Sequence, residues 1–265
     1  MQRGKAHDLL EKYGRLETPR PIIIAHRGFA GRYPENTLVA FRAGCTIGAE
    51  VIELDYHHSA DGVPVVIHDD SVERTTNGDR LWGTERLHVS SRAAKELVQL
   101  DPAAKYERYV EGERLPLLAE ALVTIQAFRI TMIERKSGDA STLLRLLRDL
   151  GYERDVIVQA FDWQFLRDCR RLSSDIVLGA LCNQEVTQGL INEATDIGVE
   201  IITWKQELLD STGINLIHAA GKQAWTYTVN EPERAQDLID AGIDGLISNY
   251  PDTMLELRSH QSKAN

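Results

Sequence analysis

Seven charged or titratable side chains lie at or near the ends of short apolar segments, and their chemical properties are complementary. Three are carboxylates, which repel one another at close range unless a cation joins them, and oxygen ligands suit a hard ion, Mg²⁺ or Ca²⁺. Two are histidines, whose ordinary pKa of about 6.5 suits proton transfer at neutral pH. The last two, an arginine and a lysine, offer positive charge to an anionic substrate. In chain order they are His26, Arg27, Glu53, Asp55, His68, Glu134 and Lys136.

The spacing of these residues allows them to converge on one phosphodiester. Glu53 and Asp55 are two positions apart, as are Glu134 and Lys136, and residues i and i+2 of a strand share a face. A divalent ion would polarise the phosphoryl group while the histidines move protons to and from oxygen. Each residue alone also has a structural interpretation, such as a solvated strand edge, but the joint pattern favours chemistry.

The elements that must position these residues form a repeating pattern. Short apolar segments alternate with amphipathic, helix-like stretches through most of the chain. Eight such alternations predict an α/β fold, a (β/α)8 TIM-type barrel, with an open doubly wound sheet as the alternative. The expected strands span 22–26, 51–56, 130–135, 155–161, 175–181, 199–205, 223–229 and 244–249, and expected helices span 37–48, 118–128, 140–150, 162–172, 186–197, 213–220 and 231–241.

One further apolar segment, PVVIH at 64–68, does not fit this alternation. Residues 57–64, which separate it from the second strand, are too few for a crossover helix and contain the tight-turn signal Asp61-Gly62. We expect a local extension beside the second strand, with His57 and His58 flanking the turn. The stretch 74–116 holds one helical candidate near 91–98 and predicts an insertion after the second strand. The expected organisation is a single domain over 1–265 with a core of about 21–252.

In such a barrel the active site lies at the carboxyl ends of the strands, which is where the seven candidates fall. Gly28 would let the backbone turn sharply after the first strand. Asn36 and Thr37 predict an N-terminal cap for the following helix.

Composition narrows the class of protein. The 265 residues are 43% hydrophobic and 26% charged, with a formal net charge of −10. This acidic balance argues against nucleic acid or an anionic membrane surface as the main partner. No apolar run approaches the ~18 residues of a membrane span, so no stable membrane insertion is expected. Three scattered cysteines without a CxxC pair, and no apparent secretory signal, predict reduced thiols and a cytoplasmic location.

The ordered motifs resemble the glycerophosphodiester phosphodiesterase family over about residues 21–252. The matching motifs are His-Arg-Gly at 26–28, Pro-Glu-Asn-Thr at 34–37, Glu-x-Asp at 53–55, Asp-Gly at 61–62, His-Asp at 68–69, Arg-Thr-Thr at 74–76 and Glu-x-Lys at 134–136. Weaker matches lie at 115–122, 159–162 and 228–232. Four positions depart from the family's frequent residues, and they are Leu117 for Thr, Ala160 for Ser, Tyr227 for Trp and Asn249 for Asp.

The resemblance implies a barrel with an insertion that hydrolyses glycerophosphodiesters to glycerol 3-phosphate and an alcohol, using one divalent cation. It implies His26 and His68 as the acid–base pair and Arg27 and Lys136 as phosphate ligands. It implies Glu53, Asp55 and Glu134 as the metal ligands. Weaker candidates for the substrate pocket are Glu35, Gln159, Trp204, Trp225 and Tyr227. The four departures bear on the preferred alcohol, because every predicted catalytic position is kept.

Three alternatives remain at this point. The chain could bind glycerophosphodiesters without turning them over, although such a binder needs no pair of proton carriers. It could act on lysophospholipids as a phosphodiesterase. It could also be a barrel aldolase or isomerase with Lys136 as the nucleophile, although Glu134 nearby would favour the charged form of that amine. The sequence makes no prediction of oligomeric state.

Overall fold

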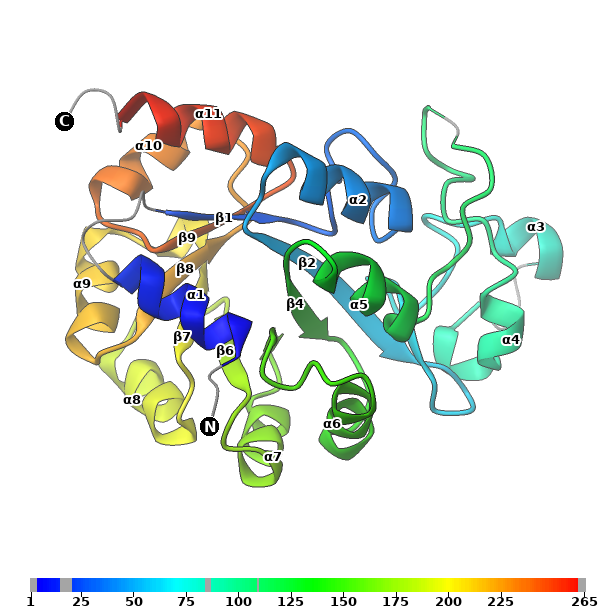
Figure 1. Ribbon diagram of the computed structural model, residues 1–265, viewed down its shortest axis with the longest axis horizontal. Helices are drawn as coiled ribbons and strands as arrows, with labels where there is room; N and C mark the ends of the chain where they lie inside the picture. The colour runs from blue at the N-terminus through cyan, green and yellow to red at the C-terminus, as the bar shows by residue number, and fades with distance from the viewer. Residues whose placement is uncertain (1–3, 15–20, 84–86, 109, 262–265) are drawn as a thin grey trace.

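Eight parallel strands close into a ring in the computed structural model, which describes residues 4–14, 21–83, 87–108 and 110–261 (Figure 1). β1 pairs with β2 on one side and with β9 on the other, so no strand edge of the ring is left open. The prediction of a (β/α)8 barrel is confirmed, and the open sheet is excluded. The strands of the ring are β1 Ile22–Ala25, β2 Val51–His58, β4 Ile130–Arg135, β5 Val156–Ala160, β6 Val177–Cys182, β7 Ile201–Lys205, β8 Gln223–Tyr227 and β9 Gly245–Ser248.

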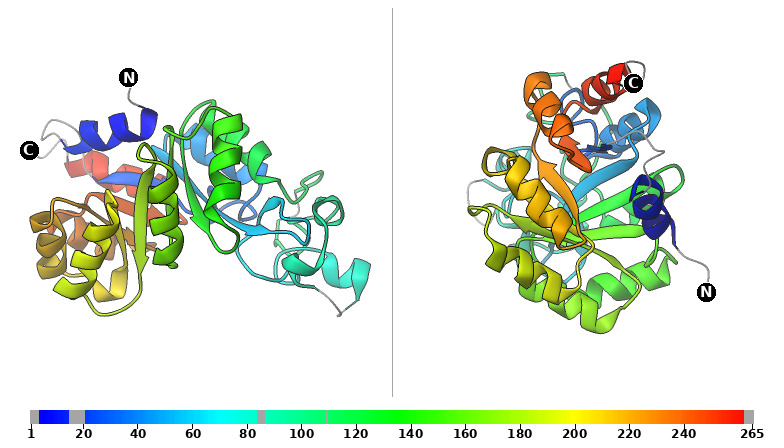
Figure 2. Two further views of the ribbon diagram at one scale, coloured as in Figure 1. Left: turned by 90° about the horizontal axis from the view of Figure 1, so that it is seen from below. Right: turned by 90° about the vertical axis from the view of Figure 1, so that its left-hand side faces the viewer.

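Helices surround this ring, as the end-on view of Figure 2 shows. They pack on the outward-facing residues of the strands through one continuous apolar layer. Asp139, Asp162, Thr187 and Asp210 each cap a helix by accepting a hydrogen bond from its first-turn backbone, worth about 1 kcal/mol per cap. The outer helices are α2 Leu38–Ile47, α5 Leu118–Gln126, α6 Ala140–Asp149, α7 Trp163–Leu172, α8 Gln188–Ile197, α9 Ser211–Ala219, α10 Pro232–Asp240 and α11 Pro251–Gln261.

The inside of the barrel is divided between an apolar lower part and a polar mouth. Inward-facing side chains at the amino ends of the strands, including Ile22, Val51 and Ile130, form a second apolar cluster. Helix α1, Lys5–Gly14, adds Ala6 to that cluster and so covers this end of the barrel. The sequence pattern did not predict this helix. Chemistry is thereby restricted to the opposite, carboxyl end of the strands.

The segment after β2 forms the predicted extension and insertion. β3, Pro64–Val66, runs antiparallel to β2 after a turn at Gly62 with φ 76°. His57 and His58 are the last two residues of β2, where they pair with Val65 and Pro64 and so flank the turn as predicted. The described part of the insertion holds α3 Gly78–Trp82, a 3-10 turn η1 at Val89–Ser91 and α4 Ala94–Leu97, and it has its own small apolar cluster. Figure 2 shows α3 and α4 projecting to one side of the barrel.

A second 3-10 turn, η2 at Gln206–Leu208, follows β7. Among the described helices, none combines the length and the apolar character needed to cross a bilayer.

Candidate active site

Three carboxylates meet inside the mouth of the barrel. Glu53 and Asp55 come from β2 and Glu134 from β4, where the strand register places Asp55 opposite Glu134. One carboxylate oxygen of each residue lies within 4.8 Å of the others, and all three residues are buried. The alternation of β2 therefore brings Glu53 and Asp55 to one face as predicted.

This triad fits a divalent cation. Glu53 Oε1 is buried with no hydrogen-bond partner in the described residues, an arrangement that costs about 1–3 kcal/mol unless a ligand compensates it. Burial and the charges of Asp55 and Glu134 raise the pKa of Glu53 well above its ordinary value. Burial and Asp55 likewise raise the pKa of Glu134 to about 7. A cation held by these oxygens would relieve both effects, and all-oxygen donors suit a hard divalent ion.

Two fixed positive charges border the carboxylates. Lys136 Nζ lies 3.2 Å from Asp55 Oδ1 and also contacts Glu134, while Arg27 Nε lies 3.3 Å from Asp55 Oδ2. Burial disfavours the charge of Lys136, but Asp55 and Glu134 outweigh it and raise its pKa. Burial also opposes ionisation of Asp55, yet Lys136 and Arg27 hold its pKa below the ordinary value. A permanently charged Lys136 is poorly suited to act as a Schiff-base nucleophile.

The backbone after β1 takes an unusual course that aims Arg27 at the triad. Arg27 has φ 52°, a left-handed conformation that is uncommon for any residue except glycine and concentrates at functional sites. In this conformation its N–H donates to Glu53 Oε2 at 2.8 Å. Gly28 follows with φ 79°, and a Cβ atom there would lie 2.6 Å from the backbone of Ala40. The glycine after His-Arg is thus required by both conformation and space.

His26 is held at the mouth by an amide. Its Nδ1 lies 2.7 Å from Asn249 Oδ1, which follows β9. Because a carbonyl oxygen can only accept, Nδ1 carries the proton and Nε2 has an open lone pair. Burial, followed by the charge of Arg27, lowers the pKa of His26 to about 4. The ring is therefore neutral at physiological pH, with Nε2 able to accept a proton.

His68 has a different partner, a carboxylate. Its Nδ1 lies 2.7 Å from Asp69 Oδ1. Burial, with the charges of Arg27 and Lys136, lowers the pKa of His68, while the charge of Asp55 and the hydrogen bond to Asp69 oppose that effect. Asp55 acts electrostatically on both histidines, so the two rings flank the same carboxylate cluster. In each ring Nε2 has no hydrogen-bond partner among the described residues.

An ion-pair bridge connects His68 to Arg27, and its central residue is Arg74. The Arg74 guanidinium binds Asp69 through Nε at 2.5 Å and Glu35 through Nη2 at 2.7 Å and Nη1 at 3.0 Å. Glu35 Oε1 also accepts from Arg27 Nη1 at 2.9 Å. The hydrogen bond from Arg74, followed by that from His68, lowers the pKa of Asp69 to about 2 in spite of its partial burial. Arg74 was not predicted as a site residue, although it lies in the Arg-Thr-Thr motif.

Two further residues support the site and were not predicted in that role. Asn36, with φ 57°, donates through its side chain to Asp55 Oδ2 at 2.8 Å and accepts from the Asp55 backbone N–H. It therefore orients a carboxylate, and only Thr37 caps α2 as predicted. His57 Nε2 donates to the carbonyl of His68 at 3.0 Å and so positions that residue's backbone.

The five weaker pocket candidates divide into two groups. Glu35 lies in the bridge, Gln159 sits opposite Glu134 in the strand register, and half-buried Tyr227 lies close enough to feel the charge of Glu134. The prediction that Trp204 and Trp225 line the pocket is wrong. Both are fully buried, because Trp204 faces the outer helices and Trp225 lies in the lower, apolar part of the barrel.

The sequence also matches known proteins over most of its length. Residues 26–253 match the family described as Glycerophosphoryl diester phosphodiesterase family. The glycerophosphodiester phosphodiesterase of Caldanaerobacter subterraneus subsp. tengcongensis is 31% identical over 250 residues, which covers 90% of this chain and 98% of that protein.

Solved structures share the fold at lower identity. The crystal structure of a Silicibacter pomeroyi protein has a TM-score of 0.85 and 24% identity, covering 95% of this chain and 97% of that one. An Oleispira antarctica phosphodiesterase, solved in complex with the product sn-glycerol-3-phosphate, has a TM-score of 0.79 and 24% identity, covering 90% and 97% of the two chains.

Proposed function

The chain belongs to the glycerophosphoryl diester phosphodiesterase family, and on that basis we propose that it hydrolyses glycerophosphodiesters to glycerol 3-phosphate and an alcohol. The observation that supports this activity best is the placement of two histidines, each with Nε2 unpaired, around a cluster of three carboxylates and two fixed cations. A phosphodiester needs charge neutralisation at its oxygens and proton transfer on both sides of phosphorus, and this set of groups provides both.

Glu53, Asp55 and Glu134 would hold the divalent cation, which we propose to be Mg²⁺ or Ca²⁺ because every donor is a carboxylate oxygen. When bound, such an ion acts as a Lewis acid toward a phosphoryl oxygen. Arg27 and Lys136, which lie partly buried beside the triad, bind the remaining phosphoryl oxygens. Their charge stabilises the negative charge that develops as the substrate is attacked.

We assign the base to His26 and the acid to His68. The amide of Asn249 holds His26 in the tautomer whose Nε2 accepts a proton, and burial beside Arg27 keeps that ring neutral. The Asp69 carboxylate opposes the lowering of the His68 pKa by burial and so favours the protonated form of this ring. His26 takes the proton of the attacking oxygen as the bond between that oxygen and phosphorus forms. His68 gives a proton to the alcohol oxygen as the bond from phosphorus to that oxygen breaks.

A turnover assay tests the activity and separates it from the alternatives. Purified protein is incubated with glycerophosphocholine, glycerophosphoethanolamine and a lysophospholipid, with EDTA and then with Mg²⁺ or Ca²⁺ restored. We expect metal-dependent release of glycerol 3-phosphate from the glycerophosphodiesters. Binding without turnover would identify a non-catalytic barrel, and full activity in EDTA with no ion found by elemental analysis would refute metal dependence. Activity on the lysophospholipid alone would identify lysophospholipids, and not glycerophosphodiesters, as the substrate class.

A further inference from the structure

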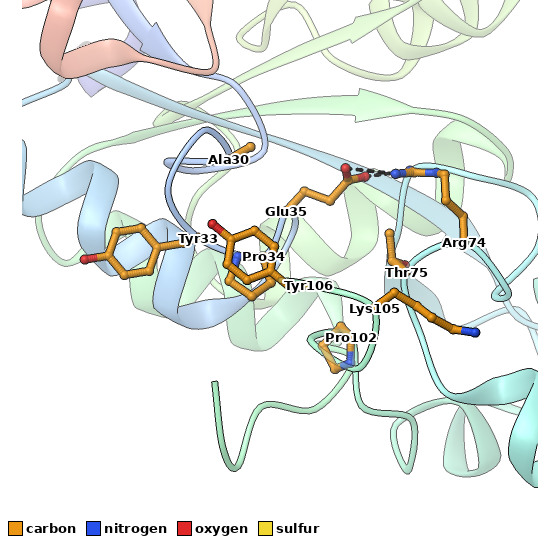
Figure 3. Close-up of a pocket in the computed structure, with 9 residues that line it drawn as sticks. All are labelled: Ala30, Tyr33, Pro34, Glu35, Arg74, Thr75, Pro102, Lys105 and Tyr106. Carbon is orange, nitrogen blue, oxygen red and sulfur yellow. Dashed lines mark hydrogen bonds and ion pairs between the residues drawn. The ribbon is translucent and has the colours of Figure 1, made fainter. Parts of the chain in front are cut away.

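A small cavity lies beside the ion-pair bridge, between the β1–α2 loop and the insertion. Its volume is about 160 Å³, which is room for several water molecules and so for the few heavy atoms of a small alcohol. Glu35 and Arg74, which line it, reach toward each other in Figure 3. Glu35 also binds Arg27, so one ion pair separates this cavity from the phosphate-binding cations.

We propose that this cavity is the subsite for the leaving alcohol and that it selects a neutral, hydroxylated alcohol such as a small polyol. The proposal rests on the proposed function and specifies the leaving alcohol, which that function leaves open. The diester that fits is a glycerol phosphate esterified to a second small polyol.

The charges of the lining argue against a charged occupant. Glu35 accepts from both Arg27 and Arg74, and Arg74 is shared with Asp69. Lys105, on the insertion, is paired with Asp79 at 2.7 Å, and in Figure 3 its amine points away from Glu35. Each lining charge thus has a partner of opposite sign, so no free charge in the lining attracts either a quaternary ammonium or an anionic alcohol.

The uncharged lining suits a polyol. The hydroxyls of Thr75 and Tyr106 line the cavity and have no hydrogen-bond partner among the described residues. Pro34, Pro102 and the tyrosine ring provide apolar surface for the carbon atoms of a ligand. Hydroxyl donors and acceptors above an apolar wall are complementary to an alcohol that carries several hydroxyl groups.

The test compares kcat/KM for three esters of glycerol 3-phosphate, the glycerol, choline and ethyl esters, at a saturating divalent ion. We expect the wild-type protein to prefer the glycerol ester. In Tyr106→Phe and Thr75→Val, the ratio of kcat/KM for the glycerol ester to that for the ethyl ester should fall about 2- to 10-fold, the worth of one net hydrogen bond. Tyr152→Phe, in the loop before β5 at the opposite end of the barrel, is the matched control and should leave that ratio unchanged.

The outcomes separate the subsite from the activity. A preference for the choline ester, or a ratio unchanged in both variants that keep the wild-type melting temperature, would overturn the subsite. A wild-type protein that turns over all three esters equally would also overturn it while leaving the proposed function intact. Failure to hydrolyse any of the three would instead overturn the proposed function.

Discussion

Replacing Asn249 by Asp should move the pH dependence of the reaction, because it changes the partner of the base from an amide to a carboxylate. Nδ1 of His26 lies 2.7 Å from Asn249 Oδ1. A carboxylate at this place, with charge centres about 4 Å apart, would stabilise the imidazolium by about 4 kcal/mol at an effective dielectric constant of about 20. At about 1.4 kcal/mol per pKa unit, that is an upward shift of roughly three units.

The sign of the effect follows from the role of the ring. In its proposed role as the base His26 works unprotonated, so activity should fall when the pH drops below its pKa, which burial and Arg27 place at about 4. Asp55 and Glu35 also face the ring and raise its pKa, so their contribution is present before and after the change. In Asn249→Asp the acid limb of kcat/KM should therefore begin at higher pH, near 7, because a shift of roughly three units is added to a pKa of about 4.

The assay is the pH profile of kcat/KM from pH 4.5 to 9 at a saturating divalent ion, so that protonation of the carboxylate triad does not intervene. Asn192→Asp on the exposed face of α8 adds the same charge far from the site and should leave the profile in place. An acid limb that stays where it is in the wild-type protein, or moves to lower pH, would refute the assignment of His26 as the base.

Three further predictions concern the rest of the site. Glu53→Gln should weaken divalent-ion binding tenfold or more, as measured by calorimetry. In the wild-type protein, binding of the ion should release protons and tighten as the pH rises toward 7, because the ion displaces protons from carboxyls whose pKa is raised. Ion binding that does not depend on pH would contradict this prediction. His68→Ala should lower kcat by about 10²–10⁴-fold and be rescued by a nitrophenyl ester, whose leaving group needs no proton; rescue of His26→Ala instead would reverse the two roles. Arg74→Lys should lower kcat by about tenfold, because a single ammonium cannot hold Asp69 and Glu35 together as the planar guanidinium does. The control Arg167→Lys, in an exposed ion pair, should have no effect on kcat. Equal kcat values for the two variants would show that the ion-pair bridge plays no part in the reaction.

The periodic pattern of the sequence was enough to predict the fold and the residues at the centre of the site. The period-two alternation of strand side chains placed Glu53 and Asp55 on one face, the alternation of strand and helix segments predicted the ring of strands, and the short separation at 57–64 predicted the extension formed by β3. These features depend on local rules, namely the alternation of strand side chains and the length that a crossover requires, and both can be read within a few residues.

The direction in which a strand side chain points, and its depth in the barrel, were harder to predict from the sequence. Trp204 and Trp225 both belong to strands that were expected, yet one faces the helices and the other lies deep in the barrel. Whether a side chain points inward or outward depends on its odd or even position along the strand, and its depth in the barrel depends on the stagger of neighbouring strands. An aromatic residue near a strand end therefore says little about the pocket until the register is known.

The partners of the two histidines were decided by tertiary structure alone. Asn249 lies 223 residues from His26, and Arg74 lies 39 residues from Glu35. Closure of the ring between β1 and β9 brings the first pair together, and the fold of the insertion against the β1–α2 loop brings the second. No local pattern encodes these distances, because ring closure joins the ends of the chain and side-chain hydrogen bonds form only where the backbones already meet. The residue types that can do the chemistry are thus determined by the sequence, while the base and acid roles that we propose depend on which neighbour the fold places beside each ring.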